Sequence, residues 1–230
     1  MAALGATDCE SQPIRLDISQ SSYPSKCGRL VSQRLEKNNI MRNTRLSTCV
    51  HEAGHAVVQL AGGPAPRIDF IAVDGLDGDI LGLVQTKAIW QPSYMEGGRA
   101  SDEIRAQWRT LAWRDCVIFL AGPIAELRHR RYSRSAIQLN WEGMAERCLG
   151  EPVPKEGTDF GQVRRRLLSA IGGDPRRAFF EVWLEAEEAV ALRWQEINSL
   201  ARLLYERGRI DDEELLKVWS ELETRMVGRH

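Results

Sequence analysis

Residues 48–63 read TCVHEAGHAVVQLAGG, and the rest of the chain can be interpreted outward from this stretch. Its pattern predicts a helix that begins at Asn43, a good N-cap residue, and runs to about Leu60, where a glycine pair stops it. Positions i and i+4 of a helix share one face. His51 and His55 can therefore direct two imidazoles at one metal ion.

Glu52 follows the first histidine and projects about 100° away from it around the helix. From there its carboxylate can reach a water held on the ion without ligating the ion itself. This is the HExxH arrangement of zinc hydrolases, which combines two neutral imidazoles, a polarised water and a carboxylate general base. The alternative is a helix whose histidines only bond to carbonyls or carboxylates. Small Ala53 and Gly54 inside the motif suit a crowded metal helix and favour the metal.

A catalytic zinc takes a third protein ligand and keeps one position for water. Elongated HExxH motifs carry a third histidine where this chain has Ala61. His129 lies in an arginine-rich segment typical of a solvated face, and His230 is the last residue of the sequence. The third ligand is therefore predicted to be a carboxylate. Spacing alone leaves Glu126 and Asp159 as the two candidates.

The remaining patterns predict a mainly α fold with a small β-sheet. Residues 67–73 and 80–86 are short, β-branched runs on either side of a turn-rich segment, which indicates two strands. After about residue 99 the periodicity is helical. A first helix is expected to end or kink at Gly122-Pro123. Further helices are expected over 135–149 and 160–171, and a last helix begins at Asp211. Between them a long helix is expected, with Asp174 as its N-cap and one apolar stripe from Phe179 to Leu204.

The N-terminal residues differ in composition from the rest. Residues 1–40 are rich in Ser, Pro and Gly without a sustained period, and we expect a loosely ordered arm there. Residues 41–230 are expected to form a single domain. The apolar stripe of the long helix has two interpretations, core packing or a seam between copies in a homo-oligomer.

Composition narrows the classes of function. The formal net charge of −1 provides no field that would attract nucleic acid, and acidic runs balance the arginine clusters. The longest apolar runs are too short to span a membrane. Five cysteines without a CxxC pair fit reduced thiols, and hence a cytoplasmic or equivalent reducing compartment, better than a disulfide framework.

The order of several segments resembles the peptidase domain of the FtsH family of ATP-dependent zinc proteases (peptidase family M41). The similarity extends from about His51 to Leu222 and rests on these segments, in chain order: HEAGHAVV, ILGLVQT, LAGPIAEL, GTDFGQVRRRL and LLYERGRIDDEEL. Two departures stand out. The sequence contains no GxxxxGK[ST] phosphate-binding loop, and Pro123 stands where the family has arginine.

The resemblance implies a zincin-like HExxH helix with a helical bundle, and zinc as the metal. It implies that His51, His55 and Asp159 are the ligands, because GTDF occupies the place of the family's aspartate-bearing segment. Glu126 would then support the site without ligating the metal. We expect a stand-alone relative that lacks the ATPase module and the membrane anchor.

The function implied is that of an ATP-independent zinc metalloendopeptidase acting on flexible or unfolded polypeptides, with Glu52 as general base. Such substrates could add as an extra strand to the edge formed by residues 80–86, or that strand could be purely structural. A competing interpretation is a non-catalytic, zinc-containing binding or regulatory module. An intact Glu52 argues against it, since a structural zinc site does not need a base.

Overall fold

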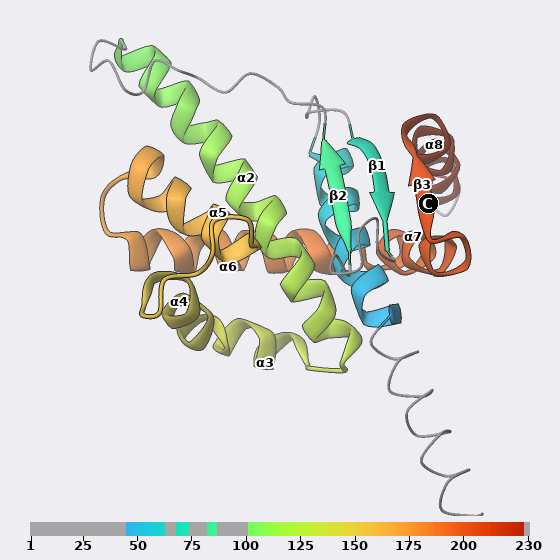
Figure 1. Cartoon of the computed structure of the whole chain (residues 1–230), viewed down its shortest axis with the longest axis horizontal. Helices are drawn as coiled ribbons and strands as arrows, with labels where there is room; N and C mark the ends of the chain where they lie inside the picture. Colours follow the sequence, from blue (N-terminus) through green and yellow to red (C-terminus); the bar gives the residue numbers. More distant parts are fainter. Residues whose placement is uncertain (1–44, 63–67, 74–81, 87–100, 228–230) are drawn as a thin grey trace, which may run out of the picture. The chain divides into compact units, whose positions relative to one another are not determined.

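The computed structural model describes residues 45–62, 68–73, 82–86 and 101–227. Within these ranges the chain is mainly helical, with one small three-stranded antiparallel sheet (Figure 1). The predicted fold class is confirmed at this level. The predicted N-terminal arm, residues 1–40, and the predicted N-cap Asn43 lie outside the described residues. No helix in the described ranges is long and apolar enough to cross a membrane.

The sheet has the strand order β2-β1-β3. The central strand β1 (Ile68–Ala72) pairs antiparallel with β2 (Leu83–Thr86) on one side and with β3 (Arg209–Asp211) on the other. The sequence predicted the first two strands but missed β3, since a three-residue strand has no detectable period. Among the described strands, β2 thus lies at one edge of the sheet.

The helix that carries HEAGH is described over residues 45–61 and is called the HEAGH helix below. It packs closely against α2 (Asp102–His129) at Gly54, where an added Cβ would lie 2.8 Å from both the Ala121 carbonyl oxygen and the Ala125 Cβ. Such a short approach requires glycine. The small residues of the motif therefore serve the crossing of these two helices.

Helix α2 continues through Pro123 to His129, so of the two outcomes predicted at Gly122-Pro123, an end or a kink, the end was wrong. Proline removes one backbone hydrogen bond from a helix interior. Ile124 and Ala125, which follow it, are fully buried against the core and hold the last two turns in place. Near its N-terminus, Ile104 and Leu111 are 42% and 53% exposed.

Three predicted helices are interrupted. Residues 135–149 form α3 (Arg134–Leu139) and α4 (Trp141–Leu149), and residues 160–171 form α5 (Asp159–Arg166) followed by a π-helical turn (Leu167–Ile171). The long helix is divided at one residue into α6 (Pro175–Leu192) and α7 (Trp194–Arg207). In the long helix the apolar stripe continues across the one-residue break, so periodicity could not reveal that break.

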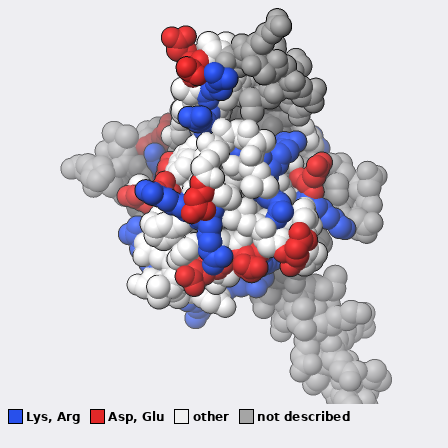
Figure 2. Space-filling view, turned by 90° about the vertical axis from the view of Figure 1, so that its left-hand side faces the viewer, with Lys and Arg blue, Asp and Glu red and all other residues white. Residues whose placement is uncertain are grey.

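That apolar stripe is buried within the chain and forms much of the core, as one of its two interpretations held. Helix α2 packs against α5 and α6, and the last helix, α8 (Asp212–Val227), packs against β1 and β3. Cys116 and Cys148 are buried free thiols, and Cys49 is buried too. Figure 2 shows one face of the described part, where basic and acidic side chains are intermingled rather than gathered by sign.

Candidate metal centre

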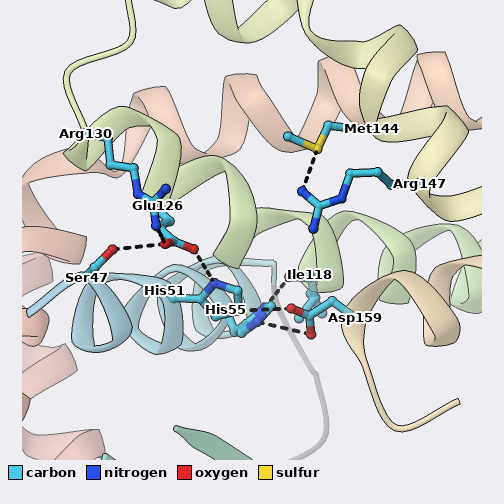
Figure 3. A network of polar contacts seen from close by, with 9 residues as sticks. All are labelled: Ser47, His51, His55, Ile118, Glu126, Arg130, Met144, Arg147 and Asp159. Atoms are coloured by element: carbon cyan, nitrogen blue, oxygen red, sulfur yellow. Dashed lines mark hydrogen bonds and ion pairs between the residues drawn. The ribbon is translucent and has the colours of Figure 1, made fainter. Parts of the chain in front are cut away.

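Three side chains that can ligate a metal converge between the HEAGH helix and α5 (Figure 3). Asp159 Oδ2 lies 2.9 Å from His51 Nε2, and Asp159 Oδ1 lies 3.4 Å from His55 Nε2. The three ligand atoms all lie within 4.8 Å of one another. In the part of the chain that the structure describes, this is the only such group of His, Cys, Asp and Glu.

Asp159 owes its position to the way α5 begins. Thr158 is the N-cap: its Oγ1 accepts a hydrogen bond from the Gly161 N–H at 3.2 Å and donates one to the Lys155 carbonyl at 2.7 Å. A Cβ on Gly161 would lie 2.9 Å from the Glu156 Cα, so the preceding loop lies directly on the first turn. These contacts direct the first residue of α5 toward the two histidines.

The two imidazoles are oriented by acceptors on their far nitrogens. Nδ1 of His55 lies 2.8 Å from the Ile118 carbonyl oxygen, which can only accept, so this nitrogen carries a proton. Nδ1 of His51 lies 3.5 Å from Glu126 Oε2. Both rings thus present Nε2 to Asp159. Metal-ligating histidines are commonly held in this way, with a carbonyl or carboxylate on the other ring nitrogen.

Glu126 lies on the opposite side of the His51 ring from Asp159. Its carboxylate accepts a hydrogen bond from Ser47 Oγ at 3.1 Å and pairs with Arg130. The hydrogen bond with His51 is the main reason that the pKa of Glu126 falls to about 2, and Arg130 acts in the same direction. Of the two carboxylates considered from the sequence, the structure brings Asp159 to the facing nitrogens and places Glu126 behind one of them.

The hydrogen bonds and charges within this group shift the pKa values of its members. Burial alone would lower the pKa of His51, but hydrogen bonds with Asp159 and Glu126 reverse the effect and raise it to about 10. Burial opposes ionisation of Asp159 too, yet His55 and His51 hold its pKa well below the usual range. The carboxylate of Asp159 therefore faces both rings, where its negative charge would stabilise a cation bound between them.

Glu52 lies beside this group, as its position in the motif predicts. Its side chain is only 7% exposed, and burial raises the pKa of its carboxyl group, while His55 and His51 act to lower it. A Cβ on Gly82 would overlap Glu52 Oε1. The backbone just before β2 thus approaches the carboxylate closely.

All four residues line one cleft of about 690 Å³. One wall is strand β2 with Gly82, and another is the face of α2 that carries Asp115, Ile118 and Phe119. Thr158 and Arg166 contribute from the two ends of α5. The candidate site is therefore open to a ligand larger than a metal ion.

The donor set fits zinc. Two imidazole nitrogens and one carboxylate oxygen are ligands of catalytic zinc sites, which keep a fourth position open. Donors about 2.0–2.1 Å from a tetrahedral ion lie about 3.3 Å apart. The two nitrogen–oxygen distances of 2.9 and 3.4 Å approach this spacing.

Gly122 of α2 provides the space in which the two rings meet. A Cβ at this position would lie 2.8 Å from His51 Nε2 and even closer to His55 Nε2. From the sequence, Gly122 is predicted only to end or kink the helix together with Pro123. A glycine inside an otherwise apolar helix is itself a signal of close approach, and it could have identified this residue.

We expect Gly122→Ala to weaken zinc binding by about 10- to 100-fold, the usual effect of disturbing the surroundings of metal ligands. The added methyl group displaces the imidazole rings rather than backbone, and alanine favours helix, so the fold should persist. Competition with a fluorescent zinc chelator measures the affinity, and circular dichroism checks the fold.

Gly143→Ala is the matched control, because a Cβ on this α4 glycine meets only the Asn140 side chain at an ordinary 3.5 Å. It should bind zinc like the wild type. Unchanged affinity in Gly122→Ala would contradict the placement of the metal between these two rings.

No protein-family model matches this chain, and no curated protein matches it. Fold and site define a mainly helical domain with a His-His-Asp group that could hold a metal ion. What the domain does must therefore be argued from the site itself.

Proposed function

We propose that this domain is a zinc-dependent metalloendopeptidase of the FtsH peptidase type, which cleaves flexible or unfolded polypeptides without ATP. The observation that carries the proposal is the convergence of His51, His55 and Asp159 in one cleft with the buried carboxyl group of Glu52 beside them. A metal site that is purely structural is closed and does not need a neighbouring base.

His51, His55 and Asp159 would hold the metal, and zinc bound there would supply Lewis-acid activation of water and of a carbonyl group. Glu52 accepts the proton of the attacking water and passes it to the leaving amine. Its burial suits this role, because a carboxyl group with a raised pKa is a better proton acceptor than an exposed one. Glu126 keeps the His51 ring in place throughout.

The lining of the cleft supports the proposed substrate class. Strand β2 lines it and pairs only with β1 among the described strands, which leaves its other edge for an extended segment of substrate. Only a chain without stable structure can offer such a segment. The sequence contains no GxxxxGK[ST] motif that would couple unfolding to ATP. Casein should therefore be cleaved, and a tightly folded protein should be spared.

Metal removal tests the proposal. We expect the purified protein to carry one zinc per chain, to cleave casein, to lose this activity when a chelator removes the zinc, and to regain it when zinc is restored. Mass spectrometry of the products and elemental analysis supply the readouts. A stable folded protein without cleavable tails is the control substrate, and calcium or magnesium should not restore activity.

Zinc bound at one per chain without cleavage of casein or of a mixed peptide library would overturn the peptidase proposal. The competing function, a binding module that retains zinc for stability, would then stand. In that case removal of zinc should lower the melting temperature without any catalytic consequence.

A further inference from the structure

Asp115 of α2 and Arg166 of α5 form an ion pair in the wall of the cleft, outside the metal group. Asp115 Oδ2 lies 2.8 Å from Arg166 Nε and 2.7 Å from Arg166 Nη2. Arg166 Nη1 donates to the side-chain and main-chain oxygens of Gln162 at 2.8 and 3.2 Å. The guanidinium also lies over the Phe119 ring, 4.8 Å from its centre.

The two partners of this pair are not equally available to a ligand. All three nitrogens of Arg166 are engaged, one of its faces is covered by an aromatic ring, and its side chain is 19% exposed. Asp115 is 38% exposed and uses only Oδ2 in the pair. Within the described residues, Oδ1 of Asp115 has no hydrogen-bond partner. The pair therefore presents an oriented carboxylate oxygen, an acceptor, to the cleft.

The position of Asp115 relates it to the bond that would be cleaved. Asp115 lies seven residues before Gly122, the residue of α2 that lies against both histidines. Because a helix rises about 1.5 Å per residue, Asp115 and Gly122 are about 10 Å apart along α2. An extended chain covers that distance in about three residues. A side chain two or three residues from the scissile bond can thus reach Asp115, allowing for the length of lysine or arginine.

We infer that Asp115 forms a subsite for a basic substrate side chain two or three residues from the cleaved bond, with Arg166 as the positioning residue that orients its carboxylate. This inference rests on the proposed peptidase function. The chemistry selects N–H donors: lysine or arginine satisfies Oδ1 with a charged donor, an uncharged aliphatic side chain does not, and a glutamate is repelled.

Peptide binding tests the inference without requiring cleavage. Fluorescently labelled decapeptides of one unstructured sequence carry lysine, norleucine or glutamate at each position in turn. They are titrated into the zinc-treated Glu52→Gln protein by fluorescence anisotropy. At one position, lysine should bind about tenfold more tightly than norleucine, the size expected for one hydrogen bond to a charged group, and glutamate should bind more weakly than both.

Asp115→Asn, added to this background, should abolish the preference while a melting curve shows that the fold is kept. Asp115→Glu should retain part of it, because it keeps a carboxylate. Asp102→Asn is the matched control. Like Asp115, Asp102 lies on α2 and pairs with an arginine, in this case Arg105, but it is 96% exposed at the start of the helix and lies outside the cleft. It should leave the lysine preference unchanged.

A lysine preference that survives Asp115→Asn, a preference for glutamate, or no charge preference at any position would overturn the inference. The two proposals fail separately. Cleavage of casein without a lysine preference removes only the subsite. A lysine preference lost in Asp115→Asn, with no cleavage by the wild type, removes only the peptidase activity.

Discussion

Glu52→Gln should lower the rate of casein cleavage by about 10²- to 10⁴-fold, the usual contribution of a general base, while zinc remains bound at one per chain. The amide has the size of the carboxyl group, so packing against Gly82 is preserved. It cannot accept a proton from water as a carboxylate does. The ligand group of His51, His55 and Asp159 is untouched. Initial rates and elemental analysis on the same samples measure both consequences.

Glu142→Gln is the matched control, because this glutamate is exposed on α4 and outside the cleft. It should cleave casein at the wild-type rate. Full activity in Glu52→Gln would remove Glu52 from the mechanism. Loss of zinc in that variant would show instead that its carboxylate supports the metal site directly.

Asp159→Asn should weaken zinc binding by more than about a hundredfold. Structural zinc sites bind the ion with a free energy of about 10–16 kcal/mol shared by four ligands, and this variant loses one anionic ligand and hence about a quarter of such a free energy. The variant also leaves His51 and His55 without the negative charge that faces both rings. Casein cleavage should fall in parallel. Zinc competition titrations, with circular dichroism as a check of the fold, measure the loss.

Two further variants sharpen this result. Asp102→Asn removes an exposed aspartate at the start of α2 and should bind zinc normally. Glu126→Gln separates the two carboxylates considered from the sequence. If zinc binding survives in Asp159→Asn and is abolished in Glu126→Gln, the assignment of Asp159 as a ligand is wrong.

What could be predicted from the sequence was local. His51 and His55 are one helical turn apart, so their shared face follows from helix geometry alone, and Glu52 is placed by the same geometry. The two longer strands and most of the helical segments follow from their periods. Errors arose where tertiary packing overrode a local rule, as at Pro123, where burial of the next two residues keeps the helix intact.

The assembly of the site depended on the tertiary structure. Asp159 is 108 residues from His51, and residue spacing could not choose between it and Glu126. Only the packing of α2, which carries Glu126, and of α5, which carries Asp159, beside the HEAGH helix places the two carboxylates on different nitrogens of one ring. The positions of Gly122 beside both rings and of Asp115 in the cleft wall also depend on packing between helices. Sequence determined which side chains each element carries and on which face, because those depend on bonds between near neighbours. Which faces meet depended on packing between distant segments. The candidate ligand group of His51, His55 and Asp159 and the cleft around it form only through that packing.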